Sequence, residues 1–405
     1  MTSADTNDPG HEDHELAELR SRLNEIDARL VAALAERQRV VEAVGRLKTE
    51  GTQRLRDVER EEQLLTRLVL RGEADGLDRH FVTRIYQEIL EQSVRRQQEH
   101  LLERDNPERA RTQRIIVQYL GAPGSYSHQA ATRHFGGHDG EVVLEGGRTF
   151  AALVEAVRRG DADYAALPIE NTTAGSINEV YDLLASEPVF IVGEEVQRVD
   201  HALLGRAGVE IASLTRILGH PQALAQCSRF LRRMSHCVAQ TVSDTAAGAE
   251  RVASGDDPTI AAIGNATAAR QYGLHTLWPA IADQRDNLTR FVIIASQPLR
   301  CDERVACKTS LQFCTPHREG ALLEALNVFY RHELNLTKLE SRPKLGEAWS
   351  YRFYLDFLGR LSDETMARVT EALIPCTSEL KHLGTYPAKT DHAPSEPRSG
   401  DGGDS

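Results

Sequence analysis

The sequence predicts a multidomain protein with an all-α N-terminal part, an α/β central part of two lobes and a small α+β C-terminal part. Three observations support this fold class. The stretch from Glu15 to Leu102 has no proline and carries a helical apolar stripe. From Ile115, short β-rich runs alternate with helical patterns. After Cys307 the expected elements follow in the order βαββαβ.

Composition limits the classes of function. The chain has 405 residues, enough for two or three domains of about 150 residues. Its 48 basic and 60 acidic residues give a net charge of −12, which argues against nucleic acid or an anionic membrane as a partner. No apolar run approaches the ~20 residues of a membrane span, and the polar N-terminus lacks a secretory pattern. Six cysteines without a C-x-x-C pair indicate reduced thiols. We therefore expect a cytoplasmic protein.

The N-terminal stripe predicts one long helix followed by two shorter ones. Apolar residues recur at spacings of three and four from Leu16 to Leu47. A helix over 15–48 would be roughly 50 Å long at ~1.5 Å per residue, which exceeds a compact domain of this size. Further helices are expected near Val58–Arg71 and Leu77–Leu102. The stripe therefore predicts a homodimer or a larger homo-oligomer.

Helix geometry sorts the polar residues of this part. Arg37 and Lys48 are eleven positions apart and share one face, whereas Arg20 lies ~25 Å from Arg37 along the axis and could reach the same small ligand only across a dimer. Two i,i+4 pairs lie on the shorter helices, namely Asp57 with Glu61 and Ser93 with Gln97. Such a set could bind a small dicarboxylate. The alternative is a set of solvated charges on amphipathic helices.

Residues 15–102 resemble the all-helical chorismate mutase module of the bifunctional P-proteins. The stretches that carry the resemblance are Leu19-Arg20, Leu34-Ala-Glu-Arg37, Gly45-Arg-Leu-Lys48, Arg56-Asp-Val-Glu-Arg-Glu61 and Glu91-Gln-Ser93-Val-Arg-Arg-Gln97. The resemblance implies a chorismate site, with Arg20 from the partner subunit and Arg60 in support, formed by Arg20, Arg37, Lys48, Asp57, Glu61, Ser93 and Gln97. It implies a rearrangement of chorismate to prephenate without a cofactor. Lys48 and Gln97 would act as catalytic donors to the ether oxygen.

A charged linker is expected over 103–113, and the central part follows over 114–296. Helices are expected at Phe150–Arg159 and Pro221–Arg233, among several short buried strands. Polar motifs stand between these elements, and each of them alone could be a loop or a satisfied core element. They are Tyr119-Leu-Gly121-Ala-Pro-Gly124-Ser-Tyr-Ser127, Leu167-Pro-Ile-Glu170-Asn171-Thr-Thr-Ala-Gly175, Gly219-His-Pro-Gln222-Ala-Leu-Ala-Gln226-Cys227, Asp244-Thr-Ala-Ala, Ala262-Ile-Gly264-Asn265 and Asn287-Leu-Thr289-Arg290-Phe291.

The order and spacing of these motifs resemble prephenate dehydratase. The resemblance implies two α/β lobes, like those of a periplasmic binding protein, with the site in the cleft. Thr289 is the residue that the family needs, and we expect its hydroxyl to donate a hydrogen bond to the departing ring hydroxyl of prephenate. Glu170, Asn171 and Gln226 are expected to bind or support prephenate. Relatives often have serine where this chain has Gly219, so one hydroxyl contact is absent.

No metal site is expected. His134 and His138 have i,i+4 spacing, but Gly136 and Gly137 between them break a helix, and no companion cluster of ligands follows.

Residues 309–386 resemble an ACT domain, a ligand-sensing ferredoxin-like unit. Two segments match the phenylalanine-binding version of this domain, namely Gly320-Ala321-Leu322-Leu323 and Leu339-Glu340-Ser341-Arg342-Pro343. The resemblance implies feedback inhibition by L-phenylalanine bound at Gly320, Ala321, Leu322, Leu323, Glu340, Ser341, Arg342 and Pro343. Without it, an ordinary helix cap and strand end would explain both segments.

Together these resemblances cover 10–102, 114–296 and 309–386, and in this order they resemble the family of bifunctional chorismate mutase/prephenate dehydratases. The resemblance implies a role in phenylalanine biosynthesis. A disordered tail is expected over 388–405. Two alternatives stay open. One is a dehydratase that prefers arogenate, and the other is a phenylalanine-sensing protein whose catalytic sites have decayed.

Overall fold

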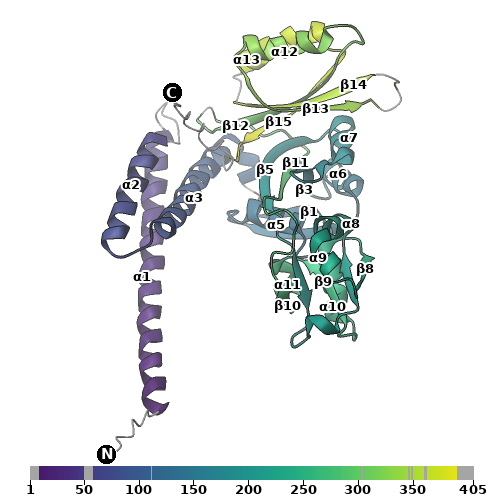
Figure 1. Cartoon of the computed structure of the whole chain (residues 1–405). Coiled ribbons are helices and arrows are strands. Elements are labelled where there is room, and N and C mark those ends of the chain that lie inside the picture. The colour runs from purple at the N-terminus through teal and green to yellow at the C-terminus, as the bar shows by residue number, and fades with distance from the viewer. Residues whose placement is uncertain are drawn as a thin grey trace, which may run out of the picture. The chain divides into compact units, whose positions relative to one another are not determined.

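The computed structural model describes residues 9–49, 58–110, 112–302, 304–344, 347, 350–359 and 363–389. The expected tail therefore lies outside the described residues from 390 onward. The chain divides into two compact units, Met1–Leu102 and Glu103–Ser405, and each is described by itself (Figure 1). Among the helices that the structure describes, none combines the length and the apolar character needed to span a bilayer.

The described residues of the first unit form three helices: α1 (Pro9–Thr49), α2 (Val58–Ala74) and α3 (Arg79–Asp105), which runs on past the end of the unit. The expected long helix is longer than predicted, because its 41 residues extend for ~60 Å. Its apolar stripe is exposed within the single chain; Leu23 and Leu30, one heptad apart, are both 57% exposed. The turn between α2 and α3 is tight, since a side chain at Gly72 would lie 2.6 Å from a Val82 methyl group.

A linker was expected at 103–113, but most of this stretch is helical. Helix α3 continues to Asp105, and Pro107 opens a short helix, α4 (Pro107–Ala110). Proline is favoured there because the first turn of a helix needs no amide hydrogen from it. Arg104 and Arg109 both belong to the second unit and bond to residues further along it. Arg104 donates to the Asp302 carboxylate at 2.7 Å, and Arg109 donates to the Gln297 carbonyl oxygen at 2.5 Å.

The central part of the second unit has two lobes, as expected. The first lobe is a six-stranded sheet in the order β2-β1-β3-β11-β5, with β4 paired to β3. Its strands are β1 (Arg114–Leu120), β2 (Glu141–Gly147), β3 (Tyr164–Asn171), β4 (Gly175–Ser176), β5 (Phe190–Arg198) and β11 (Leu288–Ala295). Its helices are α5 (Tyr126–Phe135), α6 (Phe150–Arg159) and α7 (Asn178–Ser186). The bounds of α6 match the expected helix because Thr149 caps its start and left-handed Gly160 ends it.

The second lobe is a five-stranded sheet in the order β10-β6-β9-β7-β8. Its strands are β6 (Ala202–Gly205), β7 (Arg216–Gly219), β8 (Val238–Thr241), β9 (Ile260–Gly264) and β10 (His275–Trp278). Its helices are α8 (Pro221–Gln226), α9 (Ser228–Arg233), α10 (Thr245–Ser254) and α11 (Ala266–Gln271), with a 3-10 turn, η1 (Ile211–Ser213). The chain crosses between the lobes after β5 and again before β11.

The single helix expected at Pro221–Arg233 is instead two helices. Cys227 leaves the helical region with φ −112° and ψ 25°. Asp283 causes the break, because its carboxylate accepts hydrogen bonds from the Ser228 hydroxyl at 2.7 Å and the Arg229 backbone N–H at 2.9 Å. It thereby caps the second helix from outside the chain segment. The break leaves Gln226 as the last residue of α8.

The C-terminal part is a four-stranded antiparallel sheet, the C-terminal sheet, in the order β13-β14-β12-β15. Its elements are β12 (Cys307–Cys314), α12 (Ala321–Arg331), β13 (Asn335–Pro343), β14 (Tyr351–Leu358), α13 (Asp363–Leu373), η2 (Ile374–Cys376) and β15 (Glu379–Pro387). Their order is the expected βαββαβ pattern. Helices α12 and α13 cover one face of the sheet (Figure 1).

The other face of the C-terminal sheet packs against the first lobe. Tyr354, Leu383 and Tyr386 belong to the same buried apolar cluster as residues of β3, α6, α7 and β11. The Tyr354 hydroxyl donates a hydrogen bond to the Tyr181 carbonyl oxygen at 2.9 Å. The sheet and the first lobe therefore share one core.

Candidate functional site

A cleft of about 770 Å³ lies between the two lobes of the central part. Its wall on the first lobe includes the glycine-rich loop between β1 and α5. Left-handed Gly124 lies so close to the second lobe that a side chain there would come within 3.0 Å of the Ala268 backbone. Its carbonyl oxygen accepts a hydrogen bond from the Asn265 amide at 2.9 Å. The loop is thus both a wall of the cleft and a contact between the lobes.

Asn171 and Thr289 meet at the floor of this cleft. They are paired across β3 and β11, and both line the cleft although each is less than a tenth exposed. The Asn171 side-chain oxygen accepts the backbone N–H groups of Thr173 at 3.0 Å and Ala174 at 2.9 Å, which fixes the orientation of the amide. Its nitrogen therefore donates to the Thr289 hydroxyl oxygen at 2.9 Å. Because that oxygen accepts, the hydroxyl proton remains available to a molecule in the cleft.

A short chain of polar side chains extends from Asn171 into the second lobe. The Gln226 amide nitrogen donates to the Asn171 oxygen at 3.5 Å, and the Gln226 oxygen lies 2.9 Å from Nε2 of His201. His201 is buried, and burial lowers its pKa. A neutral imidazole with its proton on Nε2 donates to Gln226 in this arrangement. The second ring nitrogen lies 3.3 Å from the Tyr126 hydroxyl.

Glu170 occupies a different face of the strand. Neighbouring residues of a strand point to opposite faces, and Glu170 is absent from the residues that line the cleft. Its carboxylate pairs with Arg290 at 3.0 Å and with the Lys338 ammonium group of the C-terminal sheet. Glu170 is therefore placed to support the strand rather than to line the cleft.

Gly219 ends β7, and its neighbour His220 lines the cleft. A Cβ atom at position 219 would lie 3.0 Å from the nearest Leu224 methyl carbon, so a side chain there would require Leu224 to move. His220 caps α8, with its ring nitrogen accepting the Gln222 backbone N–H at 3.3 Å. The mouth of the cleft at this point is made by His220 and Gln222.

In the helical unit, the structure brings together three of the seven residues expected to bind chorismate. Arg37 donates a hydrogen bond to the Ser93 hydroxyl at 2.5 Å, and that hydroxyl donates to the Ile89 carbonyl oxygen at 2.7 Å. Gln97 lies one turn further along α3, against the bare backbone of Gly45 on α1. The Gln97 side-chain oxygen is buried and has no hydrogen-bond partner among the described residues.

Two of the other four residues of this set can be placed within the single chain. Arg20 is exposed on α1, seventeen residues or ~25 Å before Arg37. Glu61 lies in the first turn of α2. Lys48 lies near the end of α1, but its side chain is outside the described residues, and so is the whole of Asp57.

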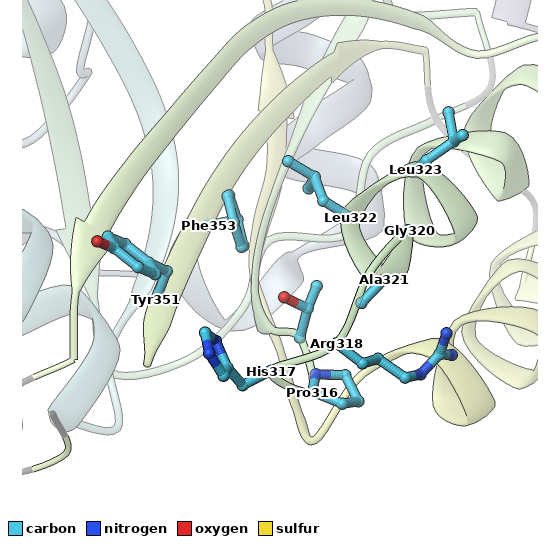
Figure 2. A pocket seen from close by; sticks show the side chains of 10 residues that line it. Pro316, His317, Arg318, Gly320, Ala321, Leu322, Leu323, Tyr351 and Phe353 are labelled. Atoms are coloured by element: carbon cyan, nitrogen blue, oxygen red, sulfur yellow. The ribbon is translucent and has the colours of Figure 1, made fainter. Parts of the chain in front are cut away.

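A second pocket, of about 200 Å³, lies at the start of α12 in the C-terminal part. Gly320, Ala321, Leu322 and Leu323 line it together with Tyr351 and Phe353 of β14. Figure 2 shows the Leu322 side chain directed toward Phe353, with His317 and Pro316 on the preceding loop. Gly320 has a left-handed backbone with φ 76°, which suits glycine.

The second segment expected at the phenylalanine site, Glu340 to Pro343, does not line this pocket. Glu340 accepts a hydrogen bond from Ser176 of the first lobe at 2.8 Å, and Arg342 pairs with Asp182 of α7 at 3.0 Å. The alternation of β13 turns these two side chains to the first lobe, whereas Ser341 and Pro343 are exposed on the opposite face.

Sequence reasoning missed several polar residues in or beside the cleft. His201 follows β5 with no motif around it, and Tyr126 and Asn287 stood inside quoted motifs without an assigned role. Asn287 is buried and accepts from the Asn171 amide at 2.7 Å. A buried polar residue beside a strand end was the available signal for His201. Within the described residues no group of three or more His, Cys, Asp or Glu side chains is arranged to hold a metal ion.

Two family models match the chain. Residues 19–98 match chorismate mutase type II, and residues 117–299 match prephenate dehydratase. The matches coincide with the helical unit and with the two lobes around the cleft.

Individual relatives agree with this division. The bifunctional chorismate mutase/prephenate dehydratase of Escherichia coli strain K12 is 39% identical over 377 residues, which are 92% of this chain and 96% of the relative. The chloroplastic arogenate dehydratase/prephenate dehydratase 2 of Arabidopsis thaliana is 37% identical over 286 residues, 68% of this chain and 74% of the relative. Among solved structures, prephenate dehydratase from Arthrobacter aurescens in complex with L-Phe superposes with a TM-score of 0.61 and 29% identity, over 70% of this chain and 92% of that one.

Proposed function

This chain belongs to the family of bifunctional chorismate mutase/prephenate dehydratases, and from this premise we propose how its own residues perform and regulate the two reactions. The helical unit rearranges chorismate to prephenate. The cleft of the central part converts prephenate to phenylpyruvate. The observation that carries the proposal is the Asn171–Thr289 hydrogen bond at the floor of the cleft.

In the mutase site, Arg37 and Arg20 of a second subunit hold the two carboxylates of chorismate in the folded conformer. Binding of this kind lowers the barrier by orientation. Lys48 and Gln97 donate to the ether oxygen, where negative charge develops as the C–O bond breaks. The position of Gln97 supports this role, because it lies against Gly45 of α1 and one turn from Ser93, which bonds to Arg37.

The helical unit acts as a homodimer. The exposed stripe on α1, which includes Leu16, Leu19, Leu23, Ile26, Leu30 and Leu34, supports this, because an apolar face of this length is stabilised by a second helix. The distance between Arg20 and Arg37 on one helix also indicates a homodimer, because one helix cannot bring both residues to one small ligand. One bound chorismate needs residues from two chains.

In the dehydratase site, Thr289 donates its hydroxyl proton toward the ring hydroxyl of prephenate as the C–O bond breaks. The carboxylate on the same ring leaves as CO₂, and its electron pair completes the aromatic ring. The departing hydroxyl group leaves as water with the proton that Thr289 donates, and the Thr289 oxygen regains a proton from solvent. The bond from Asn171 to the Thr289 oxygen supports this role, since it directs the proton away from Asn171.

L-Phenylalanine inhibits the enzyme through the C-terminal part, which is an ACT domain. The βαββαβ order and the pocket at Gly320 support this. The apolar wall of Leu322 and Phe353 suits an aromatic ring, and the α12 N-terminus offers backbone N–H groups to the carboxylate. Bound phenylalanine favours a state of the cleft with lower activity.

The test is to incubate the purified protein with chorismate alone and identify the product by mass spectrometry, with and without L-phenylalanine. Phenylpyruvate that decreases when phenylalanine is added is the expected result. Accumulating prephenate would remove Thr289 from the proposal. Unchanged chorismate with tight binding of phenylalanine would favour a sensor whose sites have decayed.

Prephenate is the preferred substrate over arogenate, its amino analogue. The E. coli relative, which matches 92% of this chain, is named a prephenate dehydratase, whereas the Arabidopsis relative carries both names. A comparison of kcat/KM for the two substrates decides this. A higher value for arogenate would overturn the preference while leaving the dehydration chemistry intact.

A further inference from the structure

Two paired residues of the first lobe turn away from the cleft next to the two that line it. On β11, Arg290 follows Thr289; on β3, Glu170 precedes Asn171. Thr289 pairs with Asn171 and Arg290 with Glu170 across the two strands. Since strand neighbours point to opposite faces, one pair faces the cleft and the other faces the C-terminal sheet. The register shifts directly after Arg290, and such a bulge re-aims the side chains beside it.

Arg290 is the centre of a buried charge cluster. Its guanidinium donates to Glu194 at 2.7 Å, to Glu170 at 3.0 Å, to Asp356 at 2.7 Å and to the Tyr386 hydroxyl at 2.8 Å. Its side chain is only 10% exposed. Glu194 and Glu170 belong to the first lobe, whereas Asp356 and Tyr386 belong to the C-terminal sheet. A single side chain therefore bonds both parts.

The cluster favours the charged forms of Arg290 and Glu170. Burial alone would lower the pKa of Arg290, but Tyr386 and the surrounding carboxylates raise it well above its usual range. Burial alone would raise the pKa of Glu170, but Arg290 and Lys338 bring it below its usual value. Lys338 reaches Glu170 from β13 of the C-terminal sheet and also lies over the Tyr181 ring.

The C-terminal sheet holds its own members of the cluster rigidly. Ser310 of β12 donates to Asp356 at 2.6 Å and lies 2.8 Å from the Tyr386 hydroxyl. The three side chains come from three adjacent strands and are all buried. The position of Asp356 is thus fixed by the whole sheet, and the position of Arg290 is fixed in turn by Asp356.

We propose that Asp356 and Lys338 of the C-terminal sheet are positioning residues of the dehydratase reaction. Through Arg290 and Glu170 they hold in place the end of β3 and the start of β11, where Asn171 and Thr289 lie. Removing one member of a buried ion pair leaves an uncompensated charge that its neighbours relax to satisfy. A misplacement of about 1 Å in a catalytic group lowers the rate by about 100-fold. The proposal rests on Thr289 as the proton donor.

The test compares two substitutions at the contact between the sheet and the first lobe. Asp356→Asn removes a charge from Arg290 while conserving size. Asp182→Asn, the matched control, breaks the ion pair between α7 and Arg342, which bridges the same two parts without touching the cluster. We expect Asp356→Asn to lower the dehydratase kcat by about 10- to 100-fold with KM for prephenate changed less than about twofold. Asp182→Asn is expected to leave kcat near wild type.

Two further measurements distinguish positioning from general damage. The mutase rate of the same protein, measured alongside, should be unchanged in Asp356→Asn. Lys338→Met removes the ion pair with Glu170 and should also lower the dehydratase kcat. This variant replaces Asp356→Asn in the test if Asp356→Asn does not fold. Equal kcat values for Asp356→Asn or Lys338→Met and the Asp182→Asn control would overturn the proposal.

A double-substitution cycle separates the proposal from the assignment on which it rests. In a Thr289→Val background, Asp356→Asn should cause no further loss of dehydratase kcat, because both changes act on the same hydrogen bond from Thr289 to the substrate. If Thr289→Val keeps wild-type activity, the assignment of Thr289 fails. If Thr289→Val is inactive while Asp356→Asn is fully active, only the positioning role fails.

Discussion

The two catalytic sites of this chain are built in opposite ways. The residues proposed for the dehydratase site, Thr289, Asn171, Gln226 and His201, form a continuous set of contacts within one chain. Of those proposed for the mutase site, Arg37, Ser93 and Gln97 meet on two helices, while Arg20 lies ~25 Å away along α1. In our proposal the first site depends on packing within the chain, and the second depends on association between chains.

The difference has a physical origin. A helical unit with few buried residues, such as Val69, Val82 and Leu101, has too little core to enclose a polar ligand by itself. Two sheets with four apolar clusters in the central and C-terminal parts can enclose one. We therefore expect changes in protein concentration to affect the mutase and leave the dehydratase chemistry largely unaffected.

The sharpest separation of the two sites is expected from Thr289→Val. This substitution conserves shape and removes the hydroxyl that donates to the leaving group, so we expect a loss of about 1000-fold in dehydratase kcat. The mutase rate should stay at the wild-type value. Prephenate should therefore accumulate from chorismate, as followed by mass spectrometry. Phenylpyruvate formed at the wild-type rate would contradict the role of Thr289.

The reverse separation is expected from Arg37→Ala. The change removes a charged hydrogen-bond donor from Ser93 and from the bound carboxylate, which we expect to lower mutase kcat/KM by about 100-fold. Dehydratase activity on added prephenate should not change. Arg39→Ala, an exposed arginine on the same helix, is the matched control. A similar loss in both variants would show that helix charge, rather than a contact with substrate, is responsible.

A smaller effect is expected from charges placed in the α1 stripe. Leu23→Lys combined with Leu30→Lys puts two ammonium groups at exposed apolar positions one heptad apart. If these positions form the dimer contact, mutase kcat/KM should fall about tenfold at low protein concentration and recover as concentration rises. Glu25→Lys, on the other side of the helix, is the control. Activity that is independent of concentration in all three proteins would refute the shared site.

The smallest expected effect is a loss of thermal stability at acidic pH. Burial lowers the pKa of His201, His128 and His220, all in the second unit. Below pH 6.5 the unfolded chain binds protons that the folded chain does not, so the free energy of unfolding decreases as pH falls. We expect calorimetry to show a lower Tm for the second unit at pH 5.5 than at pH 7.5.

His201→Gln tests the source of that effect. The variant should lose part of the dependence of Tm on pH between 7.5 and 5.5, because glutamine does not titrate. Carboxylates contribute little in this window, since those with lowered pKa values exert their effect below pH 5. The same slope in both proteins would assign the effect to other groups.

The sequence predicted the helices best where local signals were complete. Phe150–Arg159 has a capping threonine before it and a glycine after it, so its bounds could be read directly. The helix at Pro221–Arg233 was wrong because Asp283, fifty-five positions beyond Ser228, breaks it. A cap that arrives from a distant segment leaves no mark in the local pattern.

The site followed the same rule. The resemblance brought forward Asn171, Gln226 and Thr289, which the structure places together at the cleft. It did not separate Glu170 from Asn171, although adjacent strand residues face opposite ways. Nor could it indicate the partners of Arg290, because Asp356 and Tyr386 lie 66 and 96 positions away. Contacts between strands that the chain visits far apart require the sheet order, which spacing does not contain.

The contact at Gly124 limits how the cleft can open. The glycine-rich loop touches Ala268 and bonds to Asn265 on one side of the cleft, and the Tyr272 hydroxyl donates to the neighbouring Pro123 carbonyl oxygen at 3.0 Å. The lobes are joined there as well as at the two chain crossings, so they can pivot but cannot slide apart. A methyl group at position 124 would push the two lobes apart at this contact. The cleft would then have a permanently altered width when the enzyme binds its substrate, although every side chain of the cleft floor would still be in place.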